Sequence, residues 1–98
     1  MNKYNILDHK LELLLVEVDK LLVEYQDDYI KEYLEKYKNH INRIHGMIVN
    51  KTLENSKQGL LGIQRAISES DTLCSNEKLY QLACDVERYY AEECKNFE

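Results

Sequence analysis

The sequence has 98 residues, which is the size of one domain and too short for two independent cores joined by a linker. It is 44% hydrophobic and 32% charged, with no proline, no tryptophan and three glycines, a composition typical of a folded, helix-rich chain. A formal net charge of −5 argues against general affinity for nucleic acid or anionic membranes and favours a basic protein partner. We therefore predict a single domain over residues 1–98 and exclude a multi-step enzyme with its own cofactor domain.

The chain carries no signal of export or membrane insertion. Its longest uninterrupted apolar run is Leu13–Val16, and its N-terminus lacks the basic and apolar regions of a signal peptide. We expect a cytoplasmic protein. The cysteines, Cys74, Cys84 and Cys94, are odd in number and ten residues apart, about 15 Å along a helix, so we expect reduced, small apolar side chains rather than disulfides.

The first two predicted helices follow from apolar residues spaced alternately by three and four positions. A helix from about Asn5 to Tyr25 carries the stripe Leu7, Leu11, Leu14, Val18, Leu21 and Tyr25. A second helix runs from about Tyr29 to His45 or beyond and carries Ile30, Leu34, Tyr37, Ile41, Ile44 and Ile48. Asp27 or Asp28 can cap this second helix, and the short turn predicts an antiparallel hairpin. Gly46 is a natural stop, although Met47 onwards allows another turn.

The third predicted helix is the hardest to delimit. Asn50 can cap it, and its apolar positions are Leu53, Leu60, Ile63 and Ile67. Gly59 and Gly62 lie inside it at a cost of about 1 kcal/mol each relative to alanine, so the sequence allows one helix or two short pieces meeting at Gly59. The two glycines also allow a neighbouring helix to approach closely.

The last part of the chain predicts a loop followed by one helix. Residues Ser68–Ser75 are rich in serine and acid, which is typical of a loop. Ser75 or Asn76 can cap a final helix from Glu77 to about Asn96. The apolar side of that helix comprises Leu79, Ala83, Val86, Tyr90 and Phe97. Together the elements predict an all-α fold, an antiparallel bundle of about four helices.

Charge is segregated along the chain. Residues 1–35, 36–65 and 66–98 carry net charges of −5, +5 and −5, so the outer parts are acidic and the middle is basic. Acidic residues gather around the predicted hairpin turn, where three of them recur every four residues if the helical phase continues through the turn. One interpretation is a solvated face, partly neutralised in the fold by Lys36, Lys38, Arg43 and Arg65. The other is a docking surface for an electropositive partner.

Tyrosine strengthens the second interpretation, because eight of the nine aromatic residues are tyrosines. Tyrosine offers a large apolar area and a hydroxyl group, and is enriched at protein interfaces. Tyrosines on a helix flank also commonly cover a core, and we expect Tyr37 and Tyr90 to be structural. The candidate partner-binding residues form a first group, Glu24, Asp27, Asp28, Tyr29, Glu32 and Tyr33, and a second group, Glu69, Asp71 and Tyr80.

Catalytic, metal-binding and cofactor-binding motifs are absent from the sequence. His40 and His45 are five residues apart, which places them on different faces of a helix, and the cysteines lack the close pair of a zinc site. No nucleophile motif of a hydrolase occurs. The basic middle is flanked by acids and has no compact helix-turn-helix, so we expect no direct nucleic-acid binding. We predict a protein that is not an enzyme and needs no cofactor.

The chain resembles a group of small all-helical bacterial proteins. The resemblance rests on the acidic hairpin, on Gly59-Leu60-Leu61-Gly62-Ile63 at the entry to a helix, and on residues 76–83, which read Asn-Glu-Lys-Leu-Tyr-Gln-Leu-Ala. These features are similar to those of immunity proteins of polymorphic toxin systems, including contact-dependent growth inhibition systems. The resemblance implies a cytoplasmic protein that binds and neutralises the toxin of its own system.

Resemblance and charge lead to one functional hypothesis. A nuclease toxin is the natural partner, because enzymes that grip phosphate backbones are basic. The chain would capture this toxin domain through its acidic, tyrosine-rich surface. The alternative is a self-associating helical scaffold or adaptor, in which the heptad stripes of the first two helices continue across a homodimer, or a regulatory protein of a mobile element.

Overall fold

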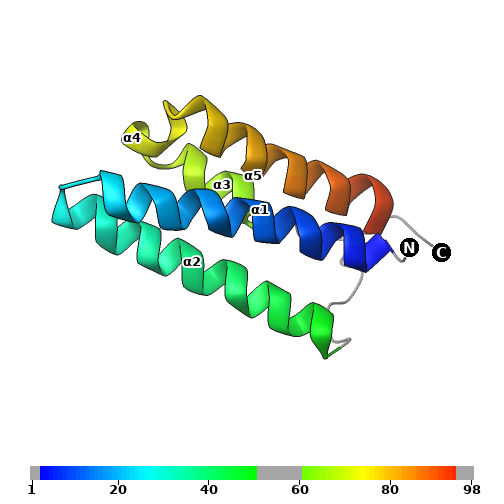
Figure 1. The fold of residues 1–98 in the computed structure, drawn as a ribbon. Helices are drawn as coiled ribbons and strands as arrows, with labels where there is room; N and C mark the ends of the chain where they lie inside the picture. The colour runs from blue at the N-terminus through cyan, green and yellow to red at the C-terminus, as the bar shows by residue number, and fades with distance from the viewer. Residues whose placement is uncertain (1–2, 51–60, 95–98) are drawn as a thin grey trace.

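The computed structural model describes residues 3–50 and 61–94, and these segments are helical almost throughout (Figure 1). The helices are α1 (Lys3–Glu24), α2 (Asp28–Val49), α3 (Ile63–Ser68), α4 (Asp71–Cys74) and α5 (Glu77–Tyr89), and α5 continues into a π-helical segment, η1 (Tyr90–Cys94). No strand occurs in the described segments. The predicted all-α bundle is confirmed.

Helix α1 lies against both other long helices and runs antiparallel to each (Figure 1). Towards α5, Lys10 Nζ lies 2.8 Å from Asp85 Oδ2, and Glu17 Oε1 lies 3.3 Å from Lys78 Nζ. Towards α2, Asp8 Oδ1 lies 2.5 Å from His45 Nδ1, and Asp19 Oδ1 lies 2.8 Å from Lys38 Nζ. In both pairings a later residue of α1 meets an earlier residue of its neighbour, as antiparallel packing requires.

The core contains the apolar stripes that the sequence predicts. From α1 and α2 it takes Leu7, Leu11, Leu14, Val18, Leu21, Ile30, Leu34, Tyr37, Ile41 and Ile44, each at most 7% exposed. The shorter helices and α5 with η1 add Ile63, Ile67, Leu73, Leu79, Ala83, Val86 and Tyr90, each at most 3% exposed. Tyr37 and Tyr90 are therefore structural, as expected. Burial of these stripes, rather than helix propensity, is what stabilises helices of this length.

The turn between α1 and α2 breaks the helical phase. Asp27 adopts an extended conformation, and its Oδ1 accepts hydrogen bonds from the amides of Tyr29 at 2.8 Å and Ile30 at 3.2 Å. Asp27 is therefore the N-cap of α2. Glu24, Asp28 and Glu32 would share one helix face only if the helical phase continued through the turn, and it does not, because this cap starts a new helix.

Helix α2 takes the later of the two ends that the sequence allows. It continues through Gly46 to Val49, and the amide of Asn50 donates to the carbonyls of Gly46 and Ile48. Ile48 packs against the core, and this burial stabilises the extra turn.

Helix α3 begins immediately after Gly62, whose φ of +80° is the left-handed conformation that glycine adopts without strain. A Cβ placed there would lie 3.5 Å from His40 Nε2, an ordinary contact. Gly62 is therefore needed for its backbone conformation rather than for the close helix approach that we expected. The predicted positions Leu53, Gly59 and Leu60 lie outside the described residues.

The segment Ser68–Ser75, predicted to be a loop, contains α4. The side chain of Ser70 accepts a hydrogen bond from the amide of Leu73 at 3.2 Å, and Leu73 is fully buried. A serine cap and one buried leucine are enough to form a helical turn where composition indicates a loop. Cys74, at the end of α4, is free and half-buried, as is Cys84 of α5.

Helix α5 starts where the sequence predicts and ends differently. The Asn76 side chain accepts a hydrogen bond from the amide of Leu79 at 3.0 Å, so Asn76 is the cap. The α-helix ends at Tyr89 and becomes π-helical, whereas the sequence predicts one helix to about Asn96. Asn96 and Phe97 lie outside the described residues.

A buried carboxylate from α5 fixes the start of α3. Glu87 is 5% exposed, and its side chain accepts hydrogen bonds from the amides of Leu61 at 3.1 Å, Ile63 at 2.6 Å and Gln64 at 3.4 Å. The first amides of a helix have no partner within the helix, and Gly62 offers no side chain to bind them. Glu87 therefore caps α3 from a different helix, with a charge that suits the positive end of the helix dipole.

We expect Glu87→Ala to destabilise the bundle by at least about 2 kcal/mol, because it leaves buried amides without acceptors. Glu93→Ala is the matched control, since Glu93 is exposed, and we expect a change of less than about 0.5 kcal/mol. Urea unfolding followed by circular dichroism measures both. Equal stability of the two variants would contradict the capping role.

Candidate functional site

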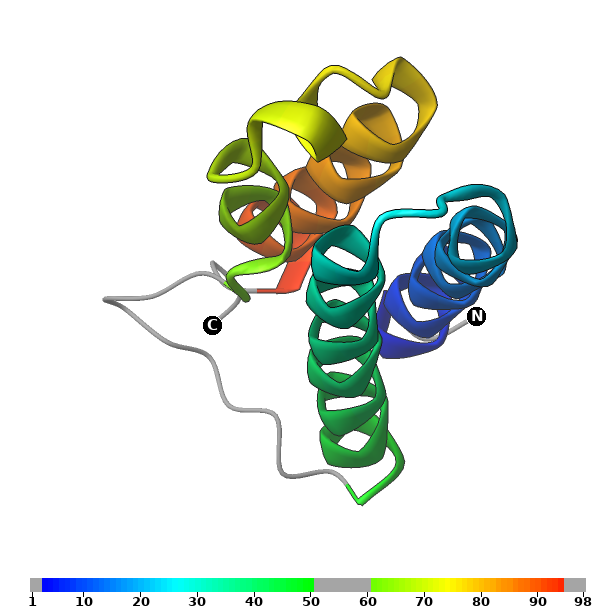
Figure 2. The same cartoon turned by 90° about the vertical axis from the view of Figure 1, so that its left-hand side faces the viewer.

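Five predicted residues from both candidate groups meet around one hollow at the end of the bundle that carries the α1–α2 turn and α4. The hollow has a volume of about 350 Å³. Figures 1 and 2 place the turn and α4 at the same end, away from the described N-terminal end of α1. We call this site the acidic hollow, and its lining residues are Asp27, Tyr29, Ile30, Tyr33, Glu69, Ser70, Asp71 and Thr72.

One wall of the acidic hollow is the first turns of α2. The cap formed by Asp27 fixes that carboxylate at the rim, and Tyr29 lies in the first turn with 73% of its surface exposed. Tyr33 follows one turn later, is half-buried against the core, and donates a hydrogen bond from its hydroxyl to the carbonyl of Ala66 in α3. One tyrosine is thus exposed to solvent, and the hydrogen bond holds the other in place.

The opposite wall is the junction between α3 and α4. Glu69 is the C-cap of α3, Ser70 is the N-cap of α4, and Asp71 is the first residue of α4. Leu73 is buried and holds this junction against the bundle. Two carboxylates, 42 and 44 residues after Asp27 in the chain, therefore face the hollow, a meeting that the sequence did not predict.

The hollow has a negative electrostatic character. No basic residue lines it, and within residues 3–50 and 61–94 neither Asp27 nor Asp71 forms an ion pair; Glu69 pairs with Arg65 at 3.0 Å. The pKa of Tyr33 is raised, first by burial and then by the negative charge of Glu69. Arg65 thus neutralises part of the surface, as the solvated-face interpretation expects, but Asp27 and Asp71 have no ion-pair partner within the described segments.

The other predicted residues lie around the hollow or away from it. Glu24 ends α1 and Asp28 begins α2, and both are exposed. Glu32 is exposed and pairs with Lys36 at 3.4 Å. Tyr80 does not line the hollow, because it lies on α5, half-buried, where its hydroxyl accepts a hydrogen bond from Gln64 Nε2 at 3.0 Å.

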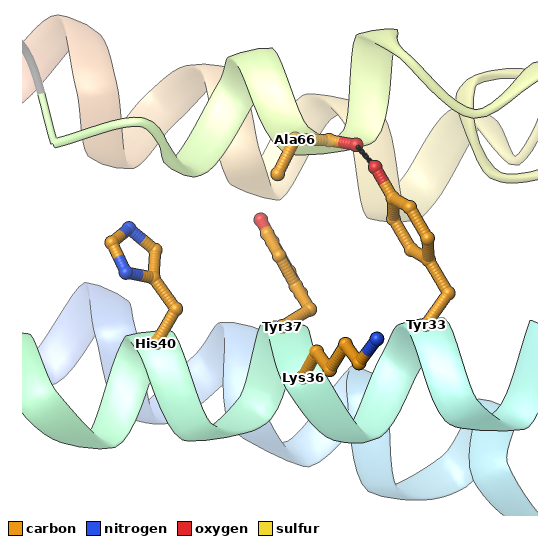
Figure 3. Close-up of a pocket in the computed structure, with 5 residues that line it drawn as sticks. All are labelled: Tyr33, Lys36, Tyr37, His40 and Ala66. Carbon is orange, nitrogen blue, oxygen red and sulfur yellow. Dashed lines mark hydrogen bonds between the residues drawn. The ribbon is translucent and has the colours of Figure 1, made fainter.

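A second, smaller hollow of about 210 Å³ lies between α2 and α3 (Figure 3). We call it the apolar hollow, and it is lined by Tyr33, Lys36, Tyr37, His40 and Ala66. In Figure 3 the aromatic rings rise from α2 towards α3. The hydroxyl of Tyr37 donates to the carbonyl of Ile63 at 2.8 Å, and His40 Nε2 donates to the carbonyl of Leu61 at 2.7 Å.

His40 holds one defined tautomer in this arrangement. Arg43 has no acceptor atom, so its hydrogen bond to His40 Nδ1, at 2.8 Å, requires that nitrogen to accept. The proton then lies on Nε2, which donates to Leu61. The middle of the chain is basic by composition, yet Arg43 bonds His40 within α2, and Lys38 pairs with Asp19 of α1.

Sequence reasoning missed two features that position these hollows. The row formed by Tyr33, Tyr37 and His40 was visible as spacings of four and three residues on one flank of α2, but its partners, the carbonyls of residues 61–66, were not. Glu87 was visible as an acid directly after the predicted core residue Val86. Only the fold shows that it binds amides of α3.

The described residues contain no group of three or more histidine, cysteine, aspartate or glutamate side chains arranged to hold a metal ion. No helix among these residues is long and apolar enough to cross a membrane. Comparisons with protein-family models, with curated proteins and with solved structures found no significant match to this chain.

The buried tyrosine of the apolar hollow gives a pH prediction. Burial raises the pKa of Tyr37, and the charge of Glu87 adds to the effect. Because the phenol ionises more readily in the unfolded chain, at about pH 10, its contribution to stability is intact below that pH and is lost as the pH rises further.

We therefore expect the free energy of unfolding of the wild type to fall more steeply above about pH 10 than that of Tyr37→Phe. Near neutral pH we expect Tyr37→Phe to be less stable by about 1 kcal/mol, because it loses the hydrogen bond to Ile63. Urea unfolding at several pH values measures both effects. Parallel pH curves would contradict the assignment.

Proposed function

We propose that this protein binds a basic protein through the acidic hollow and acts as an inhibitor of that partner. The observation that carries the proposal is the convergence of Asp27, Glu69 and Asp71 with two tyrosines around one cavity without a basic lining residue. A lysine or arginine side chain entering this cavity would gain carboxylate partners and contact with a tyrosine ring.

The charges elsewhere in the bundle support this choice of surface. Several charged residues between the helices already pair with one another, namely Lys10 with Asp85, Glu17 with Lys78, and Asp19 with Lys38. The carboxylates of Asp27 and Asp71 have no cation within residues 3–50 and 61–94. The surface charge open to a partner at this end of the bundle is therefore negative.

The resemblance to immunity proteins gives the proposal a specific form. The partner would be the toxin domain of the same system, and a nuclease is favoured because its substrate selects for a basic surface. Opposite charge accelerates association and makes it sensitive to salt. Fast capture suits an inhibitor that must act before its partner damages the cell.

A second candidate function, self-association, is favoured by one observation. Leu13, Val16 and Val23 on α1 are 46%, 67% and 78% exposed, and they lie on the outer face of the helix. The stripes that we expected to continue across a homodimer instead line the bundle core, so a dimer would have to use this outer face. Light scattering separates the candidates: a dimer lost in Val16→Asp supports self-association, and a monomer at all concentrations excludes it.

The inhibitor proposal predicts that removing charge from the hollow weakens binding without unfolding the chain. The variant is Asp27→Asn, Glu69→Gln and Asp71→Asn combined, because asparagine keeps a side-chain oxygen for capping α2. We expect at least about a tenfold loss of affinity, corresponding to 1.4 kcal/mol. Thermal unfolding should change little.

The partner for this test is the product of the adjacent upstream gene, captured at low salt and at roughly 0.5 M salt, where exposed charge pairs are screened. The control is Glu12→Gln, Glu92→Gln and Glu93→Gln combined, which removes the same number of charges from exposed positions outside the hollow. Equal losses in both variants would indicate a general effect of net charge. Full affinity of the hollow variant would refute the site.

A further inference from the structure

The apolar hollow has the chemistry of an anchor site for an uncharged side chain. The polar atoms of Tyr33, Tyr37 and His40 in its wall already have hydrogen-bond partners among the carbonyls of residues 61–66. Among the described residues no buried side-chain nitrogen or oxygen lacks a hydrogen-bond partner. The hollow thus offers ring faces and the methyl group of Ala66, which favour an apolar occupant over a polar one (Figure 3).

Lys36 does not change this preference. Its ammonium group lies 3.4 Å from Glu32, so its charge is matched within α2. What it contributes to the hollow is its hydrocarbon stem, as long basic side chains commonly do. An anionic occupant would have to compete with Glu32 for this ammonium group.

The two hollows are adjacent and share Tyr33 as a wall. Ile30 lines the acidic hollow and Tyr37 lines the apolar one, and these residues are seven apart on α2. Seven residues of α-helix span about 10 Å. A single partner segment can therefore reach both hollows with two side chains about that far apart.

We propose that the two hollows together recognise one partner segment, in which a lysine or arginine enters the acidic hollow and an apolar side chain about 10 Å away enters the apolar hollow. On a partner helix these side chains are seven residues apart. This inference rests on the proposed function and adds the sequence pattern of the partner. Charge complementarity favours the basic side chain in the acidic hollow. The apolar hollow favours an apolar side chain, because the hydrogen-bonding groups of its wall already have partners.

This arrangement divides the work of recognition. Exposed carboxylates attract many basic proteins, and such pairs contribute little to specificity when they are solvated. An apolar side chain in a fitted hollow contributes affinity only when the spacing is right, and such anchors dominate many interfaces. The pair thus discriminates a basic segment with the correct spacing from one that is merely basic.

The probe is an alanine- and glutamine-based helical peptide with blocked ends that carries one arginine and one leucine seven residues apart, made in both orders. Titration followed by amide resonances of the protein gives affinity and location. We expect one order to bind and to shift the resonances of both Tyr33 and Ala66. Replacing the leucine of the peptide by alanine should weaken binding about tenfold.

Two protein variants provide the matched comparison. Ala66→Met fills the apolar hollow, and Ser68→Met places the same side chain at an exposed position of the same helix. Ala66→Met should lower the affinity for the leucine peptide about tenfold and leave the affinity for the alanine peptide unchanged. Ser68→Met should change neither affinity. The peptide comparison needs only the wild-type protein, so it decides the question even if a variant folds poorly.

Equal affinity of the leucine and alanine peptides overturns the inference. The absence of any binding at about 1 mM peptide, where a Kd corresponds to a binding free energy of roughly −4 kcal/mol, overturns it as well. The proposed function fails separately, through full affinity of the charge-neutralised variant for its basic partner. A peptide whose arginine can be replaced by alanine without loss would count against both.

Discussion

The carboxylate of Glu87 is the interaction on which the arrangement of the second half of the bundle depends. It brings a charge from α5 into the interior and binds amides at Leu61, Ile63 and Gln64, where α3 has no cap of its own. Removing a charge from water is expensive unless hydrogen bonds replace the lost hydration. Here they do, and α3, six residues long, gains a fixed position that its length alone would not give it.

The opposite edge of the same segment is held by α2. Tyr33, Tyr37 and His40 each donate to a carbonyl of residues 61–66, so this segment presents its amides to α5 and its carbonyls to α2. Both hollows are consequences of this clamp. The spaces between the donating side chains form the apolar hollow, and the end of α3 carries Glu69 to the rim of the acidic one. Fold and candidate site therefore use the same side chains.

Much of the fold was accessible from the sequence, because apolar periodicity and capping residues are local signals. Spacing predicts the stripes of α1 and α2, and residue type narrows each cap to two candidates, of which the structure uses Asp27 and Asn76. The helical turn at α4 was missed, because a single buried leucine, Leu73, gives no periodic signal. Composition also identified the acidic and tyrosine-rich surface, but the meeting of Asp27 with Asp71 requires the tertiary fold. Glu87 shows the same limit, since a buried charge is recognisable only by its partners.

Asp27 combines two duties, since one oxygen of its carboxylate caps α2 while its charge faces the hollow. Over evolutionary time such a residue has few acceptable replacements, because only short side chains with an oxygen can take the cap. Tyr29 is exposed, and within the described segments the side chain of Asp71 caps no helix. Under the proposed function, new partner preferences would therefore arise first at Tyr29 and Asp71, while Asp27 stays constant.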